Sequence, residues 1–150
     1  MYWINSDIGI SSVNEVGLGY PAEIQIILAL DLVDGKEIPF RIYLKLKEAL
    51  VYLAHGKKIL FVCQAGISRS NGLATTLIAY LNKIDWDDAY NIIRKKVTRT
   101  QVNLDFMDSC KEALQIMRER LKKNCPYCRV PIENWESACP ICWNLIKDKE

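Results

Sequence analysis

The sequence lacks several features that would point directly to a partner or a location. No apolar run approaches the roughly 20 residues of a membrane span, so we expect no membrane partner. The net charge is only +2, from 20 Lys and Arg against 18 Asp and Glu, which argues against a polybasic protein bound to nucleic acid or anionic lipid. The first residues lack the basic start and the long apolar stretch of a signal peptide. We therefore expect a cytoplasmic protein with reduced thiols.

Cysteine is scarce in most of the chain and concentrated at its end. Four of the six cysteines lie in the last 26 residues, which leaves only Cys63 and Cys110 for the first 124. A chain that is half apolar and one quarter charged is not intrinsically disordered, and 150 residues suffice for one compact domain with a small satellite. We predict a domain over residues 1–123 and a cysteine-rich module over residues 124–150.

Apolar patterning in the first part predicts alternating strands and helices. Short apolar runs predict buried strands over 24–30 and 58–62 and weaker strands within 8–16. Apolar residues at helical spacing predict four helices, over 39–56, 71–81, 85–97 and 103–121. A strand, a helix and a second strand in this order imply parallel pairing. The fold class is therefore α/β, a small sheet with parallel strands flanked by helices.

The loop between the second predicted strand and the helix after it contains a thiol, hydroxyl groups and a guanidinium. It reads Cys-Gln-Ala-Gly-Ile-Ser-Arg-Ser from Cys63 to Ser70. Successive backbone N–H groups and a helix N-terminus can form a nest for a phosphate dianion there. The same field stabilises a thiolate at Cys63, and the Arg69 guanidinium can hold two phosphate oxygens. Gly66 permits backbone angles that a side chain would resist.

This loop resembles the Cys-x5-Arg signature of the cysteine-dependent protein phosphatases, in particular the dual-specificity class. Ala79-Tyr80-Leu81 and the segment from Val102 to Met107 extend the resemblance. It implies that Cys63 is the nucleophile that forms a phosphocysteine and that Ser70 helps the thiolate to leave. It also implies that the phosphoryl group is bound by Gln64, Ala65, Gly66, Ile67, Ser68 and Arg69. The expected reaction is hydrolysis of phosphotyrosine, phosphoserine or phosphothreonine monoesters.

A general acid must protonate the leaving oxygen. The family places this Asp some 30 residues before the nucleophile, and two candidates lie at that distance, Asp31 and Asp34. Gly35 gives the segment after Asp34 the freedom to close over the loop, which favours Asp34.

Val62 departs from the family, which usually has His before the nucleophile. Low-molecular-weight tyrosine phosphatases resemble this loop and carry an apolar residue there, so Val62 is compatible with catalysis. The neutral residues Gln64, Ala65 and Ile67 favour a phosphoprotein or phosphopeptide over a phosphoinositide. The basic run from Arg94 to Arg99 either forms a positively charged surface that attracts acidic phosphopeptides or is simply a solvated helix surface. The alternatives are a catalytically weak, phosphate-binding pseudophosphatase and a zinc-ribbon adaptor.

The tail contains two Cys-x2-Cys pairs of the kind that hold tetrahedral zinc. We predict a structural zinc ion bound by Cys125, Cys128, Cys139 and Cys142, with iron or two disulfides as alternatives. Trp135, Trp143, Ile132 and Ile141 are the expected core of this zinc-ribbon-like module, which would dock a protein or nucleic acid. The only histidine, His55, precedes Gly56 and is interpreted as a solvated residue at a helix end.

Overall fold

A computed structural model describes residues 1–15 and 21–148 of the chain. Its main sheet has four strands in the order β1-β2-β4-β3. The strands are β1 (Tyr2–Trp3), β2 (Ile8–Ser12), β3 (Ile24–Leu28) and β4 (Lys58–Cys63). Strand β4 lies in the centre and pairs in parallel with β2 and β3, whereas β1 adds an antiparallel edge. The predicted class, an α/β fold with parallel strands flanked by helices, is confirmed.

After the exposed Lys58, strand β4 is apolar because its residues are buried on both faces of the sheet. Ile59, Phe61 and Cys63 point into the main hydrophobic core, while Leu60 and Val62 alternate with them and are also buried. Strands β3 and β4 lie where the apolar runs predicted them. Of the weaker strands expected within 8–16, β2 covers the first five residues, and the end at Val16 lies outside the described residues.

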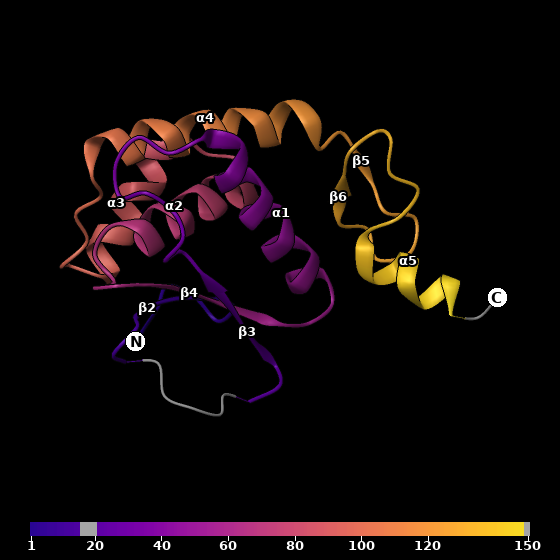
Figure 1. The fold of residues 1–150 in the computed structure, drawn as a ribbon, viewed down its shortest axis with the longest axis horizontal. Helices are drawn as coiled ribbons and strands as arrows, with labels where there is room; N and C mark the ends of the chain where they lie inside the picture. The colour runs from indigo at the N-terminus through magenta and orange to yellow at the C-terminus, as the bar shows by residue number, and fades with distance from the viewer. Residues whose placement is uncertain (16–20, 149–150) are drawn as a thin grey trace.

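Four helices lie together on one side of this sheet (Figure 1). They are α1 (Pro39–Ala54), α2 (Arg69–Asn82), α3 (Trp86–Lys96) and α4 (Leu104–Arg120). Helices α1 and α2 pack directly against β4, α3 packs against α2, and α4 spans α1 and α2. All four predicted helices are confirmed. Among the described residues, no helix combines the length and the apolar character that crossing a membrane requires.

The start of α2 differs from the prediction in a way that matters for the loop. The helix begins at Arg69 and not at Asn71, so Arg69 and Ser70 form its first turn. This turn follows directly on the loop that leaves β4, and the backbone N–H of Ser70 within it hydrogen-bonds to the thiol of Cys63. Helix α4 is capped by Asn103, whose Oδ1 accepts hydrogen bonds from the backbone N–H groups of Asp105 and Phe106.

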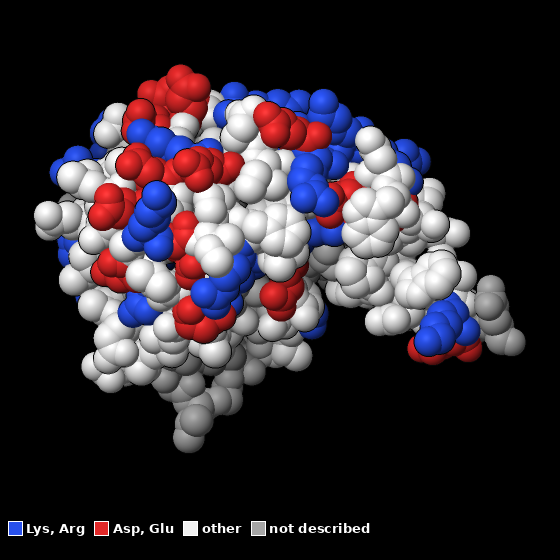
Figure 2. Space-filling view, turned by 45° about the horizontal axis from the view of Figure 1, so that its top comes forward, with Lys and Arg blue, Asp and Glu red and all other residues white. Residues whose placement is uncertain are grey.

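The tail forms a small lobe at the end of α1 (Figure 1). It contains β5 (Lys123–Asn124), which pairs with β6 (Pro131–Ile132), and α5 (Pro140–Lys147). Two buried carboxylates attach the lobe to α1, since the Lys47 ammonium lies 2.5 Å from Glu136 and 3.5 Å from Glu133. In Figure 2 this lobe is mostly uncharged, whereas acidic and basic residues are intermixed over the larger body.

The expected core of the tail is only partly correct. Ile132 is fully buried, and Val130 and Ala138 accompany it. Trp135 and Trp143 are exposed by 74% and 54%, so the prediction that they build the core is wrong. The buried cysteines take that place, which fits a segment too short to stabilise itself by apolar burial alone.

Candidate active site and metal cluster

The loop from Cys63 to Ser70 forms one wall of a cavity of about 1040 Å³. The parallel register brings the ends of β2 and β4 together there, with Ser12 opposite Cys63. The predicted loop residues that line the cavity are Cys63, Gln64, Ala65, Ile67, Ser68 and Arg69. Asp34 lines the cavity from the segment between β3 and α1. Ser70 is fully buried behind this surface.

The surroundings of Cys63 favour its thiolate form. The Sγ atom lies 3.0 Å from Ser70 Oγ and accepts a hydrogen bond of 3.3 Å from the backbone N–H of Gly66. Burial alone would raise the pKa of Cys63, but the Ser70 hydroxyl and the backbone N–H groups of Ser70, Gly66 and Ile67 hold it below its ordinary value. The resulting thiolate is the form in which cysteine acts as a nucleophile.

Gly66 is required by the geometry of the loop. Its φ of +68° lies in the left-handed region. A Cβ atom at this position would also approach the backbone N of Ser12 to 3.2 Å and the guanidinium of Arg99 to 2.9 Å. The small residue therefore lets the loop turn against β2 and aim its N–H at Cys63.

Arg69 connects the loop to the segment that carries Asp34. Its Nη1 atom donates hydrogen bonds of 3.1 Å to the backbone oxygens of Leu30 and Leu32. Ser68 Oγ donates a hydrogen bond of 2.6 Å to Asp34 Oδ1 and accepts one from the backbone N–H of Asn103. Two side chains of the loop thus hold the opposite wall of the cavity.

The two candidate acids occupy different places. Asp34 lines the cavity that contains Cys63. Asp31 instead forms ion pairs with Lys45 at 2.9 Å and Arg41 at 3.4 Å, and it is not among the residues that line the cavity. The hydrogen bond from Lys45 is the main cause that lowers the pKa of Asp31, which keeps that carboxylate ionised.

Behind the loop lies a polar chain that the sequence analysis missed. Ser70 Oγ donates to Asn71 Oδ1 at 2.9 Å, and Asn71 Nδ2 donates to Thr100 Oγ1 at 2.7 Å. All three side chains are buried, so each polar group depends on the next for its hydrogen bonds. The polar start of an otherwise apolar helix is the signal that could have revealed it. This chain fixes the Ser70 hydroxyl beside Cys63.

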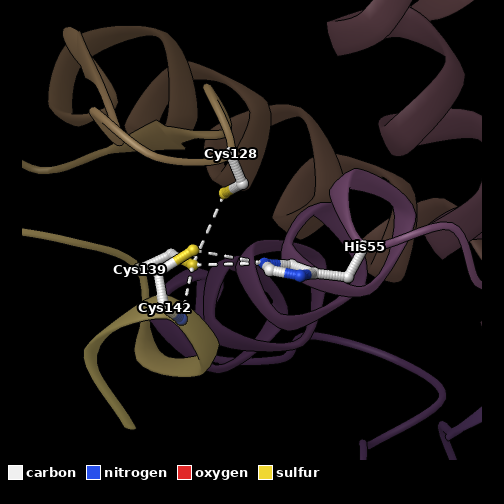
Figure 3. A group of neighbouring side chains, drawn as sticks. All are labelled: His55, Cys128, Cys139 and Cys142. Atoms are coloured by element: carbon white, nitrogen blue, oxygen red, sulfur yellow. Dashed lines mark hydrogen bonds between the residues drawn. The ribbon is translucent and has the colours of Figure 1, made fainter. Parts of the chain in front are cut away.

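A second group of reactive side chains lies where the tail meets the end of α1 (Figure 3). The ligand atoms of His55, Cys128, Cys139 and Cys142 all lie within 4.8 Å of one another. His55 Nε2 is 3.6 Å from the Sγ atoms of both Cys139 and Cys142. The interpretation of His55 as a solvated helix-end residue is wrong, because its ring is partly buried and faces the thiols. Imidazole and thiolates together are a donor set typical of zinc.

Cys125 lies beside this group but is not a member of it. Its Sγ accepts a hydrogen bond of 3.4 Å from the backbone N–H of Cys139. Burial opposes ionisation, but backbone N–H groups of Cys128, Cys139 and Tyr127 outweigh it and lower the pKa of Cys125 to about 6. All four tail cysteines are free thiols, in contrast to the disulfide alternative.

Comparisons with known proteins agree on the fold. No protein-family model and no curated protein matches the chain. The structure of Tk-PTP in its active form is similar with a TM-score of 0.61 and 15% identity, over 76% of this chain and 95% of that one. Human tyrosine phosphatase-like serine/threonine/tyrosine-interacting protein is similar with a TM-score of 0.58 and 22% identity, over 75% and 78%.

PTPMT1 in complex with PI(5)P is a third similar structure, with a TM-score of 0.52 and 18% identity. The match covers 58% of this chain and 56% of that one, so this chain spans little more than half of that structure. The chain has the fold of the tyrosine and dual-specificity phosphatases.

Proposed function

We propose that this chain is a cysteine-dependent phosphatase that hydrolyses phosphotyrosine, phosphoserine or phosphothreonine monoesters of proteins through a phosphocysteine. The observation that carries the proposal is the environment of Cys63. Cys63 lines the cavity, its pKa is below the ordinary value, and Asp34 lines the same cavity. A nucleophile and an acid that face one space are what a two-step phosphoryl transfer requires.

In the first step the Cys63 thiolate attacks phosphorus, and the bond from phosphorus to the leaving oxygen breaks. Asp34 in its protonated form donates its proton to that oxygen, so the product leaves as an alcohol or a phenol. The Arg69 guanidinium and the loop N–H groups neutralise the charge on the remaining phosphoryl oxygens. The enzyme now carries a phosphocysteine and an ionised Asp34.

In the second step water attacks phosphorus and the sulfur–phosphorus bond breaks. Asp34 takes a proton from the water, which restores the acid form, and inorganic phosphate is released. The leaving sulfur becomes a thiolate again, and the Ser70 hydroxyl, 3.0 Å away, turns its proton from Asn71 Oδ1 to the sulfur and donates a hydrogen bond to it. The buried chain through Asn71 and Thr100 positions Ser70 for this task.

The loop residues favour a phosphoprotein or phosphopeptide substrate. Gln64, Ala65 and Ile67 line the cavity without any added positive charge, which suits a single phosphoryl group better than a polyanionic inositol phosphate. The PI(5)P complex is a property of PTPMT1, which shares the fold with this chain at 18% identity.

The direct test is turnover of p-nitrophenyl phosphate by the purified chain across about pH 5 to 8. We expect release of p-nitrophenolate, and acid quenching should trap a phosphoryl group on the peptide that contains Cys63. Activity should survive mild chelation, because no metal takes part in either step. Absence of turnover on this substrate and on phosphopeptides would contradict the proposal.

The second candidate function is a pseudophosphatase, and Val62 is the observation that favours it. The residue before the nucleophile is buried and apolar, so it cannot help to set the thiolate. Ser70 and the backbone N–H groups supply that stabilisation in this chain, which is why we prefer the enzyme. Binding of a phosphopeptide without turnover would favour the pseudophosphatase.

Arg94 and Arg99 line the cavity from α3 and the segment after it, which suggests a preference for acidic phosphopeptides. Arg94 is exposed, whereas Arg99 is paired with Glu15 at 2.7 Å. We expect Arg94→Ala to raise KM for a peptide with acidic flanking residues by about three- to fivefold, as an exposed ion pair predicts, with kcat unchanged.

The matched control for this prediction is Lys96→Ala, which removes the same charge from the same helix outside the cavity lining. Steady-state kinetics with acidic and neutral phosphopeptides separate the effects. An equal rise in KM for the neutral peptide, or for Lys96→Ala, would contradict a role of Arg94 in peptide selection.

For the tail we propose a structural zinc bound by its cysteines, with residues 1–123 as the catalytic domain and 124–150 as the zinc module. The cysteine pairs, the short length of the segment and its thiol-lined interior support this proposal. Strand β4 is six residues long and spans about 17 Å, and His55 lies before its start whereas Cys63 lies at its end. Such a zinc is too remote to act on the phosphoryl group.

A further inference from the structure

His55 has a contact that the zinc pattern of the tail does not explain. It is the residue after the last turn of α1, in the phosphatase part of the chain, yet its Nε2 faces Cys139 and Cys142, which follow it by 84 and 87 residues. Figure 3 shows the imidazole on one side of the group and the three thiols on the other. A residue of the larger domain therefore supplies one of the four mutually close donors.

The spacing of these donors fits a tetrahedral zinc ion. With zinc–sulfur bonds near 2.3 Å and zinc–nitrogen bonds near 2.0–2.1 Å, the edges of the tetrahedron are about 3.5 Å between nitrogen and sulfur and about 3.8 Å between sulfurs. The two distances from Nε2 to sulfur are both 3.6 Å, and Cys128 Sγ lies 3.5 Å from Cys139 Sγ. Because all four atoms lie within 4.8 Å of one another, a zinc ion would bind them after shifts of about 1 Å or less.

Five donors are thus available for four positions, and charge distinguishes the choices. Four thiolates around Zn²⁺ leave a net charge of −2, whereas three thiolates and a neutral imidazole leave −1. Cys125, Cys139 and Cys142 are all buried, and a larger uncompensated charge costs more in such a place. Cys125 interacts with the thiols of Cys128 and Cys142 and accepts a hydrogen bond from the backbone N–H of Cys139, but it stands outside the set of four mutually close donors that includes His55.

We infer that His55 is a ligand of the tail metal, so that the centre is formed by His55, Cys128, Cys139 and Cys142 and joins the catalytic domain to the tail. This inference rests on the proposal that the tail binds zinc. The metal would hold the turn at Gly56 that leads into β4, the strand that ends at the nucleophile. Together with the ion pairs of Lys47, it fastens the lobe to α1 at two places.

X-ray absorption at the zinc edge of the purified full-length chain tests the inference without any variant. We expect about one nitrogen near 2.0–2.1 Å and about three sulfurs near 2.3 Å. A centre with four sulfurs would overturn the assignment of His55. Absence of bound zinc would overturn both the metal proposal and this inference. The phosphatase assay tests the proposed activity independently of both results.

Two variants sharpen the test, with cobalt(II) absorption as a second readout of ligand type. His55→Gln should remove the nitrogen ligand, either by weakening zinc binding more than about 100-fold or by leaving a four-sulfur centre that recruits Cys125. Cys125→Ala should keep the three-sulfur, one-nitrogen spectrum. Loss of zinc binding in Cys125→Ala together with an unchanged spectrum in His55→Gln would overturn the inference.

Discussion

Replacement of Cys63 by serine should lower the turnover of p-nitrophenyl phosphate by about 10⁴-fold or more. The hydrogen bonds of Ser70 and Gly66 lower the pKa of a thiol, but they cannot bring a serine hydroxyl into its ionised form near neutral pH. The variant therefore loses the nucleophile while the cavity keeps its shape. Steady-state kinetics with p-nitrophenyl phosphate measure the loss.

Binding should respond differently from turnover. Arg69 and the backbone N–H groups of the loop remain in Cys63→Ser, so we expect the Kd for a phosphotyrosine peptide to stay within a few-fold of that of the parent chain. Isothermal titration measures this, and it also reports that the variant is folded.

Cys110→Ala is the matched control for the loss of a buried thiol. Cys110 is fully buried, lies on α4 outside the cavity lining, and has its pKa raised by burial to about 12. Turnover should remain near that of the parent chain. If Cys63→Ser kept more than about one tenth of the activity, or if Cys110→Ala were equally inactive, Cys63 would not be the nucleophile.

Local sequence patterns were sufficient for the elements that build the cavity. The apolar run of β4 and the helical spacing after it are properties of neighbouring residues, and both elements lie where those patterns predicted them. The sequence predicts the start of α2 two residues too late, because Arg69 and Ser70 resemble loop residues in composition. Their place in the first turn depends on the approach of the loop to β2, which no local pattern contains.

The place of His55 in the metal cluster, in contrast, could not be predicted from local sequence patterns. A histidine before glycine at a helix end indicates solvent exposure when only its neighbours are considered. The contacts of His55 instead depend on how α4 returns the chain to the end of α1, more than 70 residues later. The prediction for Trp135 is wrong for a related reason, since this exposed side chain lies near the Lys47 ammonium and not inside the lobe.

The choice between the two candidate acids leads to the second large effect. Asp34→Asn should lower kcat for an alkyl phosphate, such as a phosphoserine peptide, by about 10²- to 10⁴-fold. An alkoxide is a poor leaving group and needs the proton that Asn cannot donate. Asp31→Asn should change kcat little, because Asp31 is held in ion pairs with Lys45 and Arg41 outside the cavity lining.

The leaving group provides an internal control for this prediction. p-Nitrophenolate is stable without a proton, so Asp34→Asn should slow p-nitrophenyl phosphate much less than the alkyl phosphate. A merely structural effect of losing the hydrogen bond from Ser68 would slow both substrates alike. The ratio of the two rates therefore separates an acid from a positioning residue. A large, substrate-dependent loss in Asp31→Asn with none in Asp34→Asn would assign the proton to Asp31.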